Sequence, residues 1–339
     1  MSHIMSKKPS AMQWWLLVLV LMLTGGVLVC GAALWQSRSK DQAQQTQQEL
    51  ELSAQRRREG WIELEQQWYA PRNDISTVLL VGVDEMGPLE DSGSYNNNSQ
   101  ADFLLLTVLD HRDKTMTALH LNRDSMTQIP VLGVTGQPAG TITGQLALAH
   151  TYGSGLDDSF RNTVKAVSTL LGGITIHNYI GMSMGAVPLI NDLLGGVTLT
   201  VLDDFSHLDE EMVQGAQCTL TGEQALSYLR IRKGLEDSSN VRRMQRQQQY
   251  IQALLEQLHR QGVQSLPSLE QLGALSGYLM TDFQLSELQQ LSRQQKEPYR
   301  FLGVQQIAGE AKQGEEYMEF YPDAQALQRQ VLNLFYEKQ

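Results

Sequence analysis

Three apolar runs in the first half of the chain have the pattern of buried strands. Residues 76–84, STVLLVGVD, form a continuous apolar run that ends in an acid. Residues 101–110, ADFLLLTVLD, and 115–124, TMTALHLNRD, flank the short polar segment HRDK. Runs of this length are typical of strands that are buried on both faces. We therefore expect one buried strand followed by a β-hairpin over residues 101–124.

The rest of the chain alternates helical patterns with further strands. One amphipathic pattern, SFRNTVKAVSTLL, is closed by Gly172 and Gly173, as helices commonly are. Strands are expected over residues 197–205 and 299–307. Further helices are expected over residues 184–196, 221–232, 240–261, 267–280, 285–294 and 323–337. This order predicts an α/β fold in which a mixed central β-sheet, with its antiparallel hairpin, is covered by helices on both faces.

The N-terminal region carries a different hydrophobic pattern. Residues 14–35 contain no charged residue and are bounded by tryptophans. As a helix they would span about 33 Å, which matches the roughly 30 Å hydrocarbon core of a bilayer. Interfacial tryptophans are typical of membrane helices. We therefore expect one transmembrane helix over residues 14–35, with residues 1–13 before it.

Residues 36–73 are rich in glutamine and charge. Good helix formers dominate this segment, and Trp61, Leu64 and Trp68 recur at helical spacing. We interpret it as a helical stalk whose end packs on the following domain. One globular domain is then expected over residues 74–339.

Composition, charge and missing motifs argue against several classes of protein. The chain of 339 residues has a formal charge of -11, whereas nucleic-acid-binding domains are usually basic, so no nucleic acid partner is expected. The two cysteines, Cys30 and Cys218, have neither the number nor the spacing of a disulfide framework or a metal site. The motifs of nucleotide-binding loops, serine hydrolases and zinc proteases are also missing from the sequence.

One stretch is nevertheless strongly basic. Residues 228–248, YLRIRKGLEDSSNVRRMQRQQ, carry five arginines and one lysine. Arg230 and Arg232 alternate, so in an extended segment they point the same way. Arg243 and Gln247 are separated by one helical turn, next to a helix N-terminus that favours anions. A solvated basic face is the alternative, but the excess of arginine over lysine favours a phosphate site.

Two further pairs of residues are candidates for chemistry. Asp84 ends one predicted strand and Asp102 begins the next, and carboxylates there suit Mg²⁺, which takes oxygen ligands and substrate phosphates. The alternative is that both are ordinary turn residues. Arg123 and Asp124 follow the third strand, either as a structural ion pair or as a phosphate-binding arginine beside an acid.

Taken together, these segments resemble the LytR-CpsA-Psr family of membrane-anchored cell-wall enzymes. The resemblance runs in order through LLVGVD, ADFLLLTVLD, LNRDSMTQIP, AHTYGSG, YIGMSMGAVPLINDLLGGVTLTV and LTGEQALSYLRIRKGLEDSSNVRRMQRQQQYI. It covers residues 74–339 and places the membrane helix where the family has one. The resemblance implies a single-pass protein of the cell membrane, with its N-terminus inside and its domain outside the cytoplasm.

The resemblance also implies an activity and a site. The domain would transfer a glycopolymer from a polyprenyl-pyrophosphate carrier to peptidoglycan, with the lipid tail in an apolar groove between sheet and helices. Asp84 and Asp102 would hold Mg²⁺ on the pyrophosphate. Its oxygens would contact Arg123, Arg230, Arg232, Arg243 and Gln247. The proton acceptor for the attacking hydroxyl would be Asp124 or one of the two metal-side acids.

The chain departs from the family pattern at three positions. It has Gln100–Ala101 where the family often has an arginine, Asn122 where a proline is common, and Asn240 where an aspartate is frequent. Arg242 is a candidate replacement for the missing cation. Glycopolymer transfer is the leading hypothesis, and these departures motivate a second one, a non-catalytic scaffold or sensor that binds the lipid pyrophosphate. A pyrophosphatase that releases the lipid carrier by hydrolysis is the third hypothesis.

Overall fold

The structure is a computed structural model that describes residues 46–232, 234–237, 239–261, 273, 275–284 and 299–339. The predicted transmembrane helix over residues 14–35 lies outside these residues. Within them, every helix is too short or too polar to span a bilayer. The chain divides into two compact units, one up to Pro71 with Lys338–Gln339, and one over Arg72–Glu337.

The smaller unit contains a helix and a hairpin. The helix extends to residue 58, and the strands β1 (Ile62–Leu64) and β2 (Gln67–Pro71) pair antiparallel. Gly60, at φ +79°, ends the helix in a Schellman arrangement, in which the Trp61 amide donates to the carbonyl of Arg56. The predicted continuous helix through residues 61–70 is therefore wrong.

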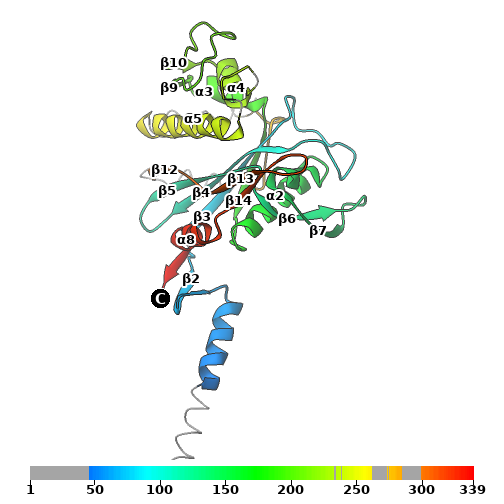
Figure 1. The fold of residues 1–339 in the computed structure, drawn as a ribbon, viewed down its shortest axis with the longest axis vertical. Helices are drawn as coiled ribbons and strands as arrows, with labels where there is room; N and C mark the ends of the chain where they lie inside the picture. Colours follow the sequence, from blue (N-terminus) through cyan, green and yellow to red (C-terminus); the bar gives the residue numbers. More distant parts are fainter. Residues whose placement is uncertain (1–45, 233, 238, 262–272, 274, 285–298) are drawn as a thin grey trace, which may run out of the picture. The chain divides into compact units, whose positions relative to one another are not determined.

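The larger unit is built on a six-stranded mixed sheet (Figure 1). The strand order is β11 (Leu279–Thr281), β8 (Asn178–Ser183), β3 (Ile75–Val83), β4 (Ala101–Asp110), β5 (Thr115–Leu121) and β12 (Arg300–Gln306). Strands β3, β4 and β5 are antiparallel neighbours, whereas β8 runs parallel to β3 and β12 parallel to β5. The predicted first strand, the hairpin and the strand near residue 300 are thus confirmed.

Helices cover both faces of this sheet. The covering helices are α2 (Asp157–Leu170), α3 (Ala186–Leu193), α4 (Gly222–Arg230), α5 (Asn240–Gln261) and α8 (Ala324–Phe335). Leu79 and Val81 of β3 belong to one core with residues of α2 and α8, while the alternate residues Leu80 and Gly82 face α3, α4 and α5. Figure 1 shows α5 on one side of the sheet and α2 with α8 on the other.

Close packing of α2 requires a glycine in β8. A Cβ atom built on Gly181 would lie 2.3 Å from the ring of Phe160, which is fully buried. Phe160 also stacks on Tyr179 with a centroid separation of 5.5 Å. The glycine therefore sets how closely this helix approaches the sheet.

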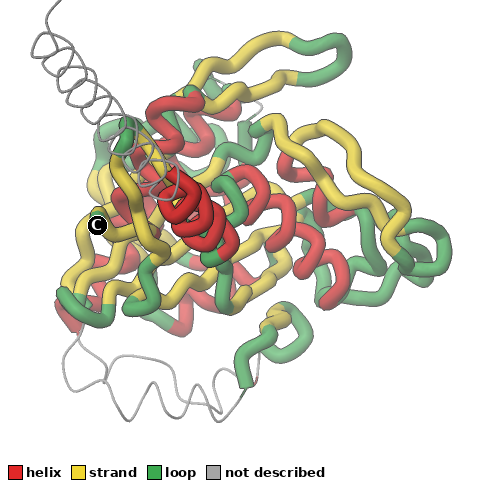
Figure 2. The backbone as a smooth tube through the Cα atoms, turned by 90° about the horizontal axis from the view of Figure 1, so that it is seen from below, coloured by secondary structure: helices red, strands yellow, loops and turns green. Residues whose placement is uncertain are grey.

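Several short elements differ from the predicted pattern. Residues 275–278 form turns that lead into β11, so the end of the helix predicted over 267–280 is wrong, and the helix predicted over 285–294 lies outside the described residues. Figure 2 shows two-stranded hairpins, in yellow, projecting from the body of the fold. The paired short strands are β6 (Met126–Leu132) with β7 (Pro138–Gln145), β9 (Val197–Thr200) with β10 (Gln217–Leu220), and β13 (Gly309–Gln313) with β14 (Met318–Pro322).

Candidate active site

The predicted charged residues meet where β4 begins, β5 ends and α5 begins. Because β4 and β5 are antiparallel, Asp102 near the start of one strand comes beside Arg123, just after the other. The Nη1 atom of Arg123 forms an ion pair with Asp102 Oδ1. Arg243, in the first turn of α5, reaches the same carboxylate with a distance of 2.9 Å between its Nη1 and Asp102 Oδ2. One buried aspartate thus joins two arginines from different elements.

A third arginine adds its charge to this pair. Arg232 follows the end of α4 and is exposed, and its positive charge contributes to lowering the pKa values of Arg123 and Arg243. Burial is the larger cause for both groups, and the pKa of Arg243 falls to about 10. We refer to Arg123, Arg232 and Arg243 as the arginine cluster. Because the three positive charges of the cluster repel one another, a multiply charged anion bound between them would be strongly favoured.

Three amide side chains complete the network around the cluster. The Nδ2 of Asn240 donates to Asp124 Oδ2 at 2.7 Å, and its Oδ1 accepts from Arg243 Nη2 at 2.8 Å. Asn122 Oδ1 accepts from the same Nδ2 at 3.3 Å, and Gln100 Oε1 accepts from Arg123 Nη2 at 2.6 Å. Gln100, Asn122 and Asn240 are therefore all first neighbours of the predicted site residues.

The remaining predicted anion ligands have different surroundings. Arg230 is the exposed last residue of α4, and among the described residues it has no ion-pair partner. Gln247 is 3% exposed and donates weakly to the Leu229 carbonyl at 3.4 Å. It lies one turn beyond Arg243 on α5, so it faces the same region, as predicted from the spacing.

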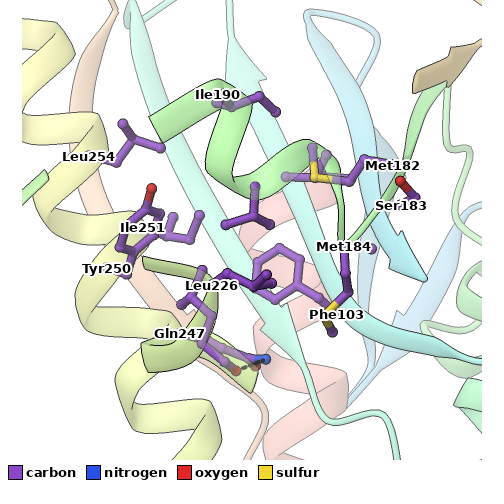
Figure 3. A pocket seen from close by; sticks show the side chains of 14 residues that line it. Phe103, Met182, Ser183, Met184, Ile190, Leu226, Gln247, Tyr250, Ile251 and Leu254 are labelled. Carbon is purple, nitrogen blue, oxygen red and sulfur yellow. Dashed lines mark hydrogen bonds between the residues drawn. The ribbon is translucent and has the colours of Figure 1, made fainter. Parts of the chain in front are cut away.

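Gln247 also lines an apolar cavity between the sheet and α3, α4 and α5. The cavity has a volume of about 120 Å³ and is lined mostly by aliphatic, aromatic and methionine side chains. Figure 3 shows Gln247 near Phe103, at the end of the cavity away from Ile190. Phe103 directly follows Asp102, so this end of the cavity adjoins the arginine cluster. The groove predicted between sheet and helices is present.

Two arginines of α5 differ from their predicted roles. Arg246 belongs to the basic stretch of residues 228–248, for which a solvated face was the alternative, but it is 0% exposed and forms a 2.5 Å ion pair with Asp203. Arg242, the candidate replacement cation, donates to the other oxygen of Asp203 and to the Leu202 carbonyl, both at 2.6 Å, and has no bond to the residues of the cluster. Val241, an apolar residue in the first turn of the same helix, is 52% exposed. The aspartate that both arginines bind was missed because it lies far upstream in the sequence.

The metal prediction rests on Asp84 and Asp102. Asp84 is exposed at the end of β3, where its Oδ1 accepts the Gln100 amide at 2.8 Å. Its charge acts on both Arg123 and Arg243, which places it beside the cluster. No group of three or more potential ligand side chains occurs within the described residues. An exposed carboxylate beside a cluster of arginines fits Mg²⁺, which uses one or two carboxylates and substrate oxygens.

A buried histidine beneath the cluster predicts a pH dependence of stability. Burial, with a smaller contribution from the charge of Arg243, lowers the pKa of His120 to about 4. Because the unfolded histidine binds a proton near pH 6.5, stability is fully present above that pH and is lost as the pH falls toward 4. We expect His120→Phe to remove about 2 kcal/mol of the stability difference between pH 7 and pH 5, measured by urea unfolding. An unchanged difference would show that folding does not lower the pKa of His120.

Comparisons with known proteins show which sequences this chain is similar to. The polyisoprenyl-teichoic acid–peptidoglycan teichoic acid transferase TagU of Oceanobacillus iheyensis is 30% identical over 226 residues, which cover 64% of this chain and 62% of that protein. The corresponding TagT transferase of Bacillus subtilis is 27% identical over 211 residues, covering 60% of this chain and 58% of that protein. The chain therefore spans about three fifths of the length of these curated relatives.

A solved structure shares the fold of this chain, and a family model matches most of its sequence. The structure of TagT bound to LIIa-WTA superposes with a TM-score of 0.57 at 24% identity, covering 77% of this chain and 90% of that one, which shows a shared fold. The sequence pattern of the LytR_cpsA_psr family matches residues 34–334. With its fold, its ordered motifs and most of its length in agreement, the chain belongs to the LytR_cpsA_psr family.

Proposed function

We propose that this protein transfers a glycopolymer from a polyprenyl-pyrophosphate carrier to peptidoglycan. The observation that carries the proposal is the arginine cluster at the end of an apolar cavity, which joins a site for a diphosphate to a site for a hydrocarbon chain. The relatives TagU and TagT, named as polyisoprenyl-teichoic acid–peptidoglycan teichoic acid transferases, support the same substrate class.

In the proposed reaction, a sugar hydroxyl of the acceptor attacks the phosphorus that bears the glycopolymer. A new phosphorus–oxygen bond forms, the phosphoanhydride bond breaks, and polyprenyl phosphate leaves with the bridging oxygen. Arg123, Arg232 and Arg243 stabilise the charge on the non-bridging oxygens, where fixed cations are most effective. A bound Mg²⁺, held by Asp84 with Asp102, would neutralise further phosphate charge.

The proton of the attacking hydroxyl goes to a carboxylate. Asp102 is the poorest acceptor because two guanidinium groups stabilise its ionised form. Asp84 is exposed and has no ion pair among the described residues, whereas Asp124 accepts from Asn240 Nδ2 through one oxygen and forms a single, longer ion pair of 3.4 Å with Arg123 Nε through the other. We therefore assign the acceptor role to Asp84 or Asp124. In the same proposal, residues 14–35 anchor the protein in the membrane with the domain outside.

A transfer assay tests this proposal against its alternatives. The full-length chain in detergent is incubated with a polyprenyl-pyrophosphate-linked glycan, Mg²⁺ and peptidoglycan fragments. Glycan joined to peptidoglycan, with release of polyprenyl phosphate, is the expected result. Cleavage to a free glycan phosphate in the absence of acceptor would identify a pyrophosphatase. Binding of the substrate without formation of any product would identify a scaffold or sensor. The lack of activity would then be attributed to Asn122 and Asn240, the residues expected to be proline and aspartate in the family pattern.

Filling the apolar cavity should weaken lipid binding specifically. Ile251 of α5 lines the cavity, and the larger side chain of Ile251→Trp would occupy the space for the hydrocarbon chain. We expect at least a tenfold loss of affinity for geranylgeranyl pyrophosphate, about 1.4 kcal/mol, while affinity for inorganic pyrophosphate stays unchanged. Leu302→Trp, at a 49% exposed position of β12, is the size-matched control. Equal loss of both affinities would contradict the assignment of the cavity to the lipid.

A further inference from the structure

Arg246 is a buried cation that the proposed reaction does not use. It is 0% exposed, and its guanidinium is hydrogen-bonded at all three nitrogens. Its Nε donates to the Tyr228 carbonyl at 2.8 Å, and its Nη2 donates to the carbonyl of Ile231. Its Nη1 pairs with Asp203 at 2.5 Å. Because all three guanidinium nitrogens already have partners in the protein, Arg246 does not bind a substrate directly. Its role depends on the backbone groups to which it donates.

The two carbonyls belong to the end of α4 and the residue just after it. Carbonyls in the last turn of a helix have no partner within the helix and accept hydrogen bonds from elsewhere. Arg246 supplies those bonds through the planar fork of its side chain, which binds several acceptors in one orientation. The clamped segment, Tyr228–Ile231, ends immediately before Arg232. Arg246 therefore fixes the backbone from which Arg232 projects.

This restraint matters because no hydrogen bond or ion pair to another described residue holds the Arg232 side chain. It is exposed, and within the described part of the chain it forms no ion pair. Its charge is repelled by Arg123 and Arg243, since all three are cationic and close enough to interact. If the backbone before it were free, Arg232 would move away from the other two arginines, and ligand binding would have to provide the free energy to bring it back. When the backbone is already held in place, binding does not include this free-energy cost, which is the general advantage of preorganisation.

We propose that Arg246 is a positioning residue that holds the segment after α4, so that Arg232 stands beside Arg123 and Arg243 before the pyrophosphate binds. The inference rests on the proposed function, in which Arg232 binds the pyrophosphate. The competing explanation is that Arg246 is only the counter-ion of Asp203. Arg242 offers a matched control because it pairs with the same aspartate at 2.6 Å but donates to the Leu202 carbonyl instead of the clamped segment.

A double-mutant cycle separates these explanations. The full-length chain in detergent is titrated with geranylgeranyl pyrophosphate. Arg246→Lys keeps a charge near Asp203 but lacks the fork that reaches both carbonyls. We expect it to raise the Kd about tenfold in the wild-type background, and less than about twofold in the Arg232→Ala background, where nothing remains to be positioned. Arg242→Gln should leave the Kd within about twofold.

A second variant covers the case in which Arg246→Lys does not fold. Arg246→Met combined with Asp203→Asn removes both partners of the fully buried pair, and the remaining partner of Asp203, Arg242, is partly exposed to water. The same loss of affinity, again confined to chains that contain Arg232, is expected. Amide hydrogen exchange of residues 229–232 should become faster in either variant.

The outcomes distinguish this inference from the function on which it rests. If Arg232→Ala alone leaves the Kd unchanged, the proposed pyrophosphate site is wrong. If Arg232→Ala weakens binding but Arg246→Lys has the same effect in both backgrounds, the pyrophosphate site stands and the positioning role is overturned. If Arg242→Gln lost as much affinity as Arg246→Lys, the positioning role would likewise be overturned. The result would show that Arg246 matters only as a counter-ion of Asp203.

Discussion

Replacing Arg232 by alanine is expected to lower kcat/KM for glycopolymer transfer by about 10²–10³-fold without destabilising the protein. The loss of rate follows from removing one of three cations that face the transferred phosphate. Stability should stay within about 0.5 kcal/mol, because Arg232 is exposed and its removal relieves repulsion with Arg123 and Arg243. Transfer kinetics and urea unfolding of the same preparation measure the two effects.

The control for Arg232→Ala is an arginine of similar exposure on the other face of the sheet. Arg161 of α2 is 54% exposed and pairs with Asp157, so Arg161→Ala makes the same change in net charge away from the site. It should retain full activity. If Arg232→Ala also retained full activity, the arginine cluster would not be the phosphate site. Equal losses in both variants would point to net charge instead of position.

Asp102→Asn is expected to have the largest effect on stability. The carboxylate is the shared partner of Arg123 and Arg243, and Arg243 is only 3% exposed. Removing one partner of a buried ion pair leaves the other charge uncompensated, which typically costs about 3–5 kcal/mol. The change should appear as a lower urea midpoint with an unchanged slope.

Asp84→Asn provides the comparison for that measurement. Both variants remove one negative charge next to the cluster, but Asp84 is exposed and has no ion pair among the described residues. We expect it to lose less than about 1 kcal/mol. A loss of that size in Asp102→Asn would mean that Arg123 and Arg243 do not depend on Asp102 for their stability in the fold.

The fold was predictable where one physical signal dominated. Continuous apolar runs predicted β3, β4 and β5 because strands buried on both faces tolerate few polar residues. The hairpin after Gly60 was missed because Trp61, Leu64 and Trp68 are three and four residues apart, a spacing that a helix also shows. The glycine was the contrary signal, since a positive φ there ends the preceding helix.

The site was predictable in its residue types but not in its pairings. The concentration of arginine indicated an anion site, and the spacing placed Arg243 and Gln247 on one side of α5. The sequence contains no comparable signal for Asp203. This residue forms ion pairs with Arg242 and Arg246, so that Arg243 alone of the three arginines belongs to the cluster. Which of three neighbouring arginines meets the substrate depends on partners that only the folded chain brings together.

The shared carboxylate of Asp102 has a consequence for selectivity. In the free protein it acts as an internal counter-ion that occupies both Arg123 and Arg243. An incoming anion must displace this carboxylate from two guanidinium groups, so a singly charged ion gains little by the exchange. A diphosphate offers enough oxygens to replace the lost contacts and enough charge to engage Arg232 as well. If the proposed function holds, this exchange makes the resting site select a diphosphate over small singly charged anions.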